Sequence, residues 1–126
     1  MLFRSVSDVN RQLTRDVEET GRFMTLFYLL IDQTRGNLQW VRAGHDPALW
    51  YDPATDRFDE LRGAGIALGV DDGWHYTANE KSGLKKGQVI LLSTDGIWET
   101  RNPAGKMFGK DHIRKIIRQI DRKSVV

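Results

Sequence analysis

The spacing of hydrophobic positions near the N-terminus is that of a helix with one apolar face. Val6, Val9, Leu13 and Val17 recur at steps of three and four residues, which places them on one side of an α-helix. Gly21 follows this stripe, and glycine is common just after the C-terminus of a helix. The pattern therefore predicts an N-terminal amphipathic helix that ends before Gly21.

A second helical stripe lies close to the C-terminus. Its apolar positions are isoleucines at the same kind of spacing, namely Ile113, Ile116, Ile117 and Ile120. This spacing predicts an amphipathic C-terminal helix.

Between the two helices the pattern is that of short strands. Residues 23–31 form a nearly unbroken aromatic and aliphatic run, which is typical of a strand covered on both faces. Turn-forming residues 32–37 lead into a strand over 38–43, so the three segments predict a hairpin. The remaining strands are expected at residues 48–51, 57–61, 74–79 and 89–92. A helix, mostly antiparallel strands and a second helix in this order indicate an α+β fold with helices packed on sheets.

Residues 62–73 contain four glycines around the apolar residues Ile66, Ala67 and Leu68. Because these apolar side chains need burial, we expect an ordered loop held against the body of the protein rather than a flexible linker. Asp71 and Asp72 near its end are expected to be exposed to solvent.

Length and composition are those of a single globular domain over residues 1–126. Hydrophobic residues make up 40% of the chain and charged residues 29%, an ordinary balance for a soluble protein. No apolar run approaches the roughly 20 residues of a membrane helix, and no signal-peptide pattern is present. The absence of cysteine excludes disulfides and thiolate metal sites and fits a reducing compartment. We therefore expect a cytoplasmic protein that does not bind membranes.

The charge distribution argues against nucleic acid as a partner. The formal net charge is only +2, and no aromatic-plus-basic surface motif or DNA-binding pattern is present. Basic residues do recur at steps of four along the C-terminal helix, at Lys110, Arg114, Arg118 and Arg122. A solvated helix face explains this stripe, and a phosphate-rich or acidic partner is the alternative.

Three longer segments, in this order and spacing, resemble segments of a known protein family. They are Gly-Arg-Phe-Met-Thr-Leu-Phe-Tyr at 21–28, Val-Arg-Ala-Gly-His-Asp-Pro-Ala at 41–48 and Gly-Gln-Val-Ile-Leu-Leu-Ser-Thr-Asp-Gly-Ile-Trp-Glu at 87–99. Shorter matches are Gly-Ile-Ala-Leu-Gly-Val at 65–70, Arg-Asn at 101–102 and Met-Phe-Gly at 107–109. From about residue 2 to 120 the chain resembles the central portion of a serine/threonine phosphatase domain of the SpoIIE/RsbU type, a branch of the PPM phosphatases.

The resemblance implies a fold and an activity. The fold is an α-β-β-α sandwich, and the activity is that of a protein phosphatase with a binuclear Mg2+ or Mn2+ site at one edge of its sheets. The two metals activate a water molecule for attack on phosphoserine or phosphothreonine. The implied substrate is a phosphorylated STAS-type anti-anti-sigma protein, whose dephosphorylation acts in a sigma-factor partner switch.

Asp95 is the residue that the resemblance marks as a metal ligand. It follows a buried strand, before Gly96, where a carboxylate would face the crevice at the strand's end. Carboxylate oxygens are the ligands that Mg2+ and Mn2+ prefer, and Gly96 would let the backbone pass close to the site. Without the resemblance, Asp-Gly after a strand is more often an ordinary turn.

Two further residues are candidates for places beside the metals. His45 could line the site or relay a proton, or it could instead bond backbone at its turn. Glu99 could orient the metal ligands by hydrogen bonding without binding the metal, or its charge could stabilise the start of a helical segment. No residue is assigned as a catalytic acid, base or nucleophile.

The chain departs from the family at its metal site. The family's Gly-Asp motif and its Asp-Asp-x-Thr segment both supply metal ligands, and neither motif occurs here. The resemblance therefore implies a truncated domain, and the end Arg-Lys-Ser-Val-Val at 122–126 does not continue the family's pattern. Because one carboxylate is a poor ligand set for two divalent cations, we expect weak or absent catalysis from this chain alone.

Two consequences follow from the departure. The chain could be a catalytically silent module that binds proteins of the same regulatory system, and this is the alternative to a phosphatase. A domain without some of its strands would also expose sheet edges and apolar faces, so we expect self-association.

Overall fold

The computed structural model describes residues 2–123, and it describes side-chain surroundings for residues 4–120. These residues form two compact units, each made of two segments of the chain. The α1 unit comprises Met1–Pro47 and Leu61–Lys86, and the α2 unit comprises Ala48–Glu60 and Gly87–Val126. The single domain expected over residues 1–126 stays a prediction.

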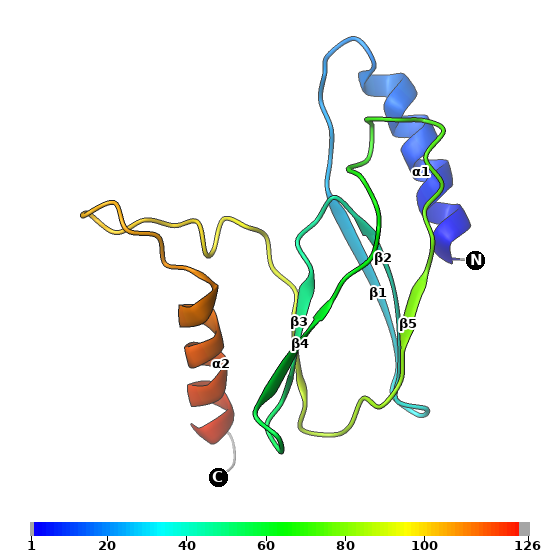
Figure 1. The fold of residues 1–126 in the computed structure, drawn as a ribbon. Coiled ribbons are helices and arrows are strands. Elements are labelled where there is room, and N and C mark those ends of the chain that lie inside the picture. Colours follow the sequence, from blue (N-terminus) through cyan, green and yellow to red (C-terminus); the bar gives the residue numbers. More distant parts are fainter. Residues whose placement is uncertain (1, 124–126) are drawn as a thin grey trace. The chain divides into compact units, whose positions relative to one another are not determined.

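The α1 unit is one helix and a three-stranded antiparallel sheet (Figure 1). The helix is α1 (Leu2–Val17), and the strands are β1 (Leu26–Asp32), β2 (Asn37–Ala43) and β5 (Asn79–Lys81). The strand order is β1-β2-β5, and β1 pairs with β2 along its whole length, from Leu26 opposite Ala43 to Asp32 opposite Asn37. The expected hairpin is confirmed.

The polar turn between β1 and β2 forms as its sequence predicts. The carboxylate of Asp32 accepts backbone N–H bonds from Thr34 at 3.1 Å and Arg35 at 3.3 Å. Gly36 has a φ of +67°, and a Cβ there would lie 2.7 Å from the carbonyl oxygen of Leu84. Only glycine fits this position without displacing backbone.

Helix α1 buries a more polar face than its apolar stripe predicts. Val6 is buried, but Val9 is 49% exposed, so its placement on the buried face was wrong. The buried face instead includes Ser7 and Asn10. The hydroxyl of Ser7 accepts the backbone N–H of Tyr76 at 3.1 Å. This bond satisfies a buried N–H group and explains why a polar residue lies on the inner face of the helix.

Asn10 joins α1 to the glycine-rich loop, and its side chain is completely buried. The amide oxygen accepts the N–H of Gly69 at 2.9 Å, and the amide nitrogen donates to the carbonyl of Asp71 at 2.8 Å. Leu68, which is also fully buried, exchanges two backbone hydrogen bonds with Met24. The loop is therefore ordered against the rest of the unit, as expected from its apolar residues.

Two strand predictions in this unit were wrong. The segment 23–31 was expected to be covered on both faces, but Tyr28 is 46% and Leu30 50% exposed. In the described part of the chain only the face that carries Phe27 is covered. The expected strand at 74–79 is replaced by β5 at Asn79–Lys81, because the N–H of Tyr76 bonds Ser7 rather than a neighbouring strand.

The α2 unit has a second three-stranded sheet with a helix packed on it (Figure 1). Its strands are β3 (Ala48–Asp52), β4 (Arg57–Leu61) and β6 (Val89–Leu91), and its helix is α2 (Lys110–Lys123). The order is β4-β3-β6, and β3 pairs antiparallel with β6. Two helices and two small antiparallel sheets confirm the predicted α+β class.

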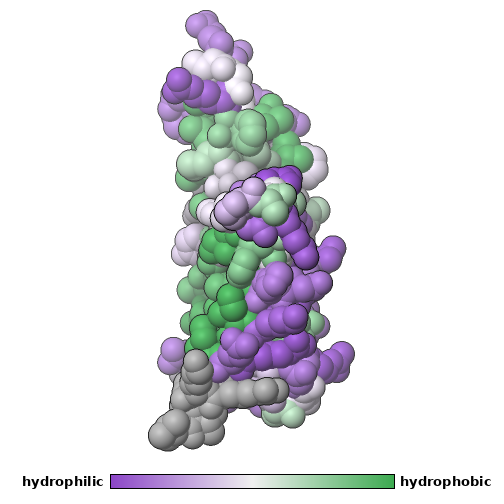
Figure 2. Space-filling view, turned by 90° about the vertical axis from the view of Figure 1, so that its left-hand side faces the viewer, coloured by the Kyte–Doolittle hydropathy of each residue, from purple (hydrophilic) through white to green (hydrophobic). Residues whose placement is uncertain are grey.

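The core of the α2 unit forms between α2 and the sheet. Ile113 and Ile117 are buried with Leu49 and Tyr51, and partly buried residues surround them, including Phe58, Val89, Leu91, Trp98 and Phe108. The other two isoleucines of the helix, Ile116 and Ile120, are exposed. Figure 2 shows one face of the molecule, on which apolar and charged surface gather in separate bands.

The basic stripe of α2 is not a purely solvated face. Arg118 lies 2.8 Å from the carboxylate of Asp56 and 4.9 Å from the centre of the Phe58 ring. Arg114 lies 3.7 Å from the carboxylate of Glu60. These side chains fasten α2 to β4 and the turn before it. The predicted fourth member, Arg122, lies outside the residues whose side chains are described. No helix in the described range 2–123 is long and apolar enough to cross a membrane.

Replacing Asn10 with Ala should destabilise the protein strongly. The change leaves the N–H of Gly69 and the carbonyl of Asp71 without their buried partner, which costs about 3 kcal/mol in free energy of unfolding. Urea denaturation of the variant measures this loss. The control is Gln12→Ala, which removes only an exposed bond to Asp16 and should cost less than about 0.5 kcal/mol. Equal losses would show that Asn10 does not fix the loop.

Tyr76 should make stability fall at alkaline pH. Burial, and then the charge of Asp71, raises its pKa above the ordinary value of 10.0, and its hydroxyl donates to the carbonyl of Ile66 at 2.6 Å. The folded state therefore holds this proton more tightly than the unfolded state, so the stabilisation is present below pH 10 and disappears as pH rises through the folded pKa.

The comparison that tests this effect is between the native chain and Tyr76→Phe. Urea unfolding at about pH 8 and about pH 10.5 gives the loss of stability for each protein. The native chain should lose more than the variant, because phenylalanine has no proton to lose. Equal losses would mean that Tyr76 contributes nothing to the alkaline transition.

Candidate functional site

Asp95 lies in the α2 unit, four residues after the end of β6. The strand before it was expected to be buried, but the residues of β6 are only half-buried. The chain from residue 95 to 99 is a turn rather than a helix, closed by hydrogen bonds from Ile97 N–H to the Thr94 carbonyl and from Glu99 N–H to the Asp95 carbonyl. The residue is exposed, and none of the residues with described side chains bonds its carboxylate. This carboxylate is therefore held in place only by its backbone and is open to a ligand from solvent.

The neighbours of Asp95 are as open as Asp95 itself. Gly96 and Glu99 are exposed, and the carbonyl of Gly96 accepts the hydroxyl of Thr100 at 2.6 Å. A Cβ at Gly96 would meet only the Thr94 hydroxyl, at 3.7 Å. Within the described residues, no close approach of backbone requires glycine at this position.

His45 lies in the α1 unit, just after β2. Its Nδ1 donates to the backbone carbonyl of Asp46 at 2.8 Å, because a carbonyl can only accept. The ring meets Phe27 edge-on with centroids 6.0 Å apart, and the carbonyl of His45 accepts the Nε–H of Arg42. The half-buried residue thus bonds backbone at its turn, while a role in catalysis stays a prediction.

The described residues do not make up a metal site by themselves. No three histidine, cysteine or carboxylate side chains come together among them. Asp71 and Asp72 are exposed as expected, and the carboxylate of Asp71 accepts the N–H of Gly73 at 2.9 Å. One open carboxylate does not fit the ligand demand of a binuclear Mg2+ or Mn2+ centre.

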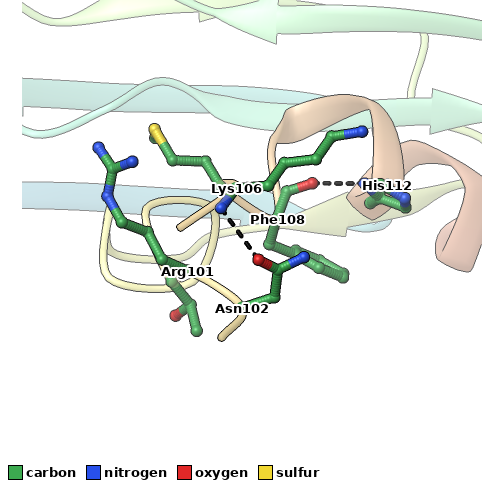
Figure 3. A pocket seen from close by; sticks show the side chains of 7 residues that line it. Arg101, Asn102, Lys106, Phe108 and His112 are labelled. Atoms are coloured by element: carbon green, nitrogen blue, oxygen red, sulfur yellow. Dashed lines mark hydrogen bonds between the residues drawn. The ribbon is translucent and has the colours of Figure 1, made fainter. Parts of the chain in front are cut away.

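A cavity of about 400 Å3 in the α2 unit was not predicted as a site. It is lined by Thr100, Arg101, Asn102, Lys106, Met107, Phe108 and His112 (Figure 3). Its residues include the short Arg-Asn and Met-Phe-Gly segments that match the family, but nothing in these segments indicated a pocket. The cavity forms because a tight turn brings residues 100–102 beside residues 106–108, where Arg101 and Met107 form an antiparallel bridge.

The chain matches a family model over nearly its whole length. The family is described as Stage II sporulation protein E (SpoIIE), and the match covers residues 4–125. Phosphoserine phosphatase RsbU from Bacillus subtilis (strain 168) is 29% identical over 116 residues, which are 90% of this chain and 34% of the relative. The chain thus spans about a third of the length of this relative.

Two solved structures are similar in fold. The RsbU and RsbW domains of Rv1364c from Mycobacterium tuberculosis give a TM-score of 0.70 at 23% identity, over 96% of this chain and 32% of that one. The phosphatase domain of the cell fate determinant SpoIIE from Bacillus subtilis, presoaked with Mn, gives 0.52 at 14% identity, over 85% and 54%. At these identities the similarity concerns the fold.

The family match agrees with the resemblance noted in the three sequence segments. It extends beyond those segments to residues 4–125, and the fold comparison agrees with it. The chain therefore belongs to the SpoIIE family, with a phosphatase-type domain like those of SpoIIE and RsbU.

Proposed function

We propose that this chain acts in a protein phosphatase that removes phosphate from phosphoserine or phosphothreonine in a STAS-type anti-anti-sigma protein. The observation that carries the proposal is the SpoIIE family match over residues 4–125. A relative named phosphoserine phosphatase supports the reaction type. In this proposal the protein works in the cytoplasm as part of a sigma-factor partner switch, with Mn2+ or Mg2+ as cofactor.

Asp95 is the proposed metal ligand. Its carboxylate is exposed and has no partner among the described side chains, so binding a cation would break no existing interaction. Hard cations prefer oxygen ligands, and this preference does not separate Mn2+ from Mg2+. Gly96 and Glu99, from the same unit, are proposed to line or support this site. A role for His45 in catalysis stays a prediction of the resemblance.

The ligand count limits the activity expected from this chain. The described residues offer Asp95 but no cluster of three ligands. A divalent cation held by one carboxylate and water is bound weakly. We therefore expect hydrolysis to be slow and to need high metal concentration.

The proposal is tested by phosphate release from a phosphorylated STAS-type protein with and without added Mn2+. We expect slow release that needs Mn2+ and that falls to the level of the blank in Asp95→Ala, because the variant loses the one open carboxylate at the site. The matched control is Asp72→Ala, which removes another exposed carboxylate and should leave the rate within about twofold of the native chain.

The alternative is a silent binding module, and the missing ligand cluster in the described residues favours it. It predicts no release by any variant, together with affinity for the STAS-type protein that depends on neither its phosphate nor a metal. Isothermal titration with the phosphorylated and unphosphorylated protein measures this. A result without release and without binding would reject both functions.

We also propose that the chain self-associates through the free edge of β1. This strand lies at one end of the β1-β2-β5 order, and it exposes the large apolar side chains Tyr28, Leu30 and Ile31. An edge strand of this kind presents unpaired N–H and carbonyl groups to another chain. A second copy of β1 could pair there, which would extend the sheet and place the exposed apolar side chains of the two copies side by side.

Leu30→Lys should weaken this association, because charged side chains on an edge strand oppose edge-to-edge pairing. Analytical ultracentrifugation over a range of concentrations should show dimers of the native chain and a dissociation constant raised roughly tenfold in the variant. Val70→Lys is the control, since Val70 is equally apolar and exposed but lies outside β1. A native chain that stays monomeric at high concentration would contradict the proposal.

A further inference from the structure

A tight turn shapes the cavity of the α2 unit. Residues Arg101 and Met107 face each other in an antiparallel bridge, and backbone hydrogen bonds join Asn102 N–H to the Lys106 carbonyl at 2.9 Å and Phe108 N–H to the Thr100 carbonyl at 2.7 Å. Gly105 closes the turn with a φ of +83°. The two sides of the turn are therefore fixed relative to each other.

Side chains add to this framework. The amide oxygen of Asn102 accepts the N–H of Lys106 at 3.0 Å. The guanidinium of Arg101 donates to the carbonyl of Gly105 at 2.8 Å. His112, from the first turn of α2, uses Nδ1 to donate to the carbonyl of Phe108, and its ring stacks on that of Phe108 with centroids 5.1 Å apart. The side chains of Arg101, Asn102 and His112 are thus held in place.

The lining of the cavity can carry positive charge but no negative charge. Among its seven residues are arginine, lysine and histidine, and none is a carboxylate. Figure 3 shows Arg101 on one side of the hollow and His112 on the other, with Asn102 and Lys106 between them. This lining disfavours metal cations and favours an anion.

Several hydrogen-bond donors of the lining have no partner inside the described structure. Arg101 uses one of its five N–H groups in the bond to Gly105. The amide nitrogen of Asn102 and the ammonium of Lys106 make no bond to another described residue. With Nδ1 donating to the carbonyl of Phe108, the second ring nitrogen of a neutral His112 carries no hydrogen and is not counted as a donor. The N–H groups of Arg101, Asn102 and Lys106 are available to an incoming oxyanion.

We propose that this cavity binds a phosphate group, either as inorganic phosphate or on a phosphorylated side chain. Phosphate offers several acceptor oxygens and up to two negative charges, which suit a lining that contains Arg101, Asn102 and Lys106. The hollow of about 400 Å3 is open to solvent, since six of its seven lining residues are exposed, so a phosphate carried on another protein could reach it. Met107 and Phe108 supply apolar surface for the group that carries the phosphate. The site uses none of the residues proposed for the metals.

Titration followed by amide NMR tests the proposal without any catalysis. The probes are inorganic phosphate, a phosphoserine peptide and the same peptide with serine, all in buffer with a metal chelator. Phosphate and the phosphopeptide should both shift the amides of Arg101, Lys106 and His112, and the serine peptide should not. Tighter binding of the phosphopeptide identifies a phosphorylated side chain as the ligand, and equal binding identifies the free ion. The proposal is wrong if neither probe shifts these amides.

Variants separate a built site from general attraction to positive charge. Lys106→Gln should weaken phosphate binding roughly tenfold, the usual effect of losing one charge-assisted hydrogen bond. Lys106→Arg should restore most of the affinity. The control Lys115→Gln removes the same charge from an exposed position on α2 outside the cavity and should change the affinity less than about twofold.

The two glutamine variants also give the outcome that would overturn the proposal. Equal loss of affinity in both would mean that phosphate responds to overall charge rather than to the cavity. Lys106 bonds Asn102 only through its backbone, so replacing its ammonium group should leave the turn folded. The amide spectrum of each variant checks this. Since binding is measured with metals chelated, failure here leaves the phosphatase proposal intact, and failure of that proposal leaves this one intact.

Discussion

The structure of the α1 unit depends on the buried amide of Asn10. A helix and a glycine-rich loop that are about 60 residues apart in sequence meet at this side chain, which bonds one backbone donor and one backbone acceptor of the loop. A buried backbone group without a partner is costly, so a loop of this kind can approach a helix only where such a side chain meets it. The positions of Leu68 and Tyr76 in the core follow from that contact.

The α2 unit fastens its helix by a different means. Arg118 and Arg114 reach from α2 to the acidic residues Asp56 and Glu60, and their stems and charges also cover Phe58. These ion pairs lie near the surface, where such pairs contribute little by themselves. The isoleucines under them supply most of the attachment, and the arginines set which side of α2 faces the sheet.

Periodicity predicted the type of most segments, with the strand expected at 74–79 as an exception, but it could not predict what covers each segment. The helices and the hairpin were read correctly, since their signals lie within a few residues. The apolar run of β1 indicated burial on both faces, yet Tyr28 and Leu30 are exposed because hydrophobicity does not report the presence of a neighbour. Asn10 was not predicted as a core residue, because a polar residue is expected to be exposed unless its hydrogen-bond partners, here about 60 residues away, are known. The place of Asp95 after a strand was predictable from local sequence, and the cavity at residues 100–112 was not, because it arises from the pairing of the turn.

Asp95 and the cavity of the α2 unit carry opposite charges: the first is a carboxylate, and the second is lined by basic residues. A divalent metal needs several oxygen ligands at one point, and the described residues bring no three such ligand residues together. An oxyanion needs several donors around one hollow, and the cavity offers arginine, lysine, histidine and an amide together. Holding a phosphate group and hydrolysing it are separate demands on a protein, because the first needs only donors and the second needs an activated water as well. On ligand counting alone, the described residues come closer to meeting the first demand than the second.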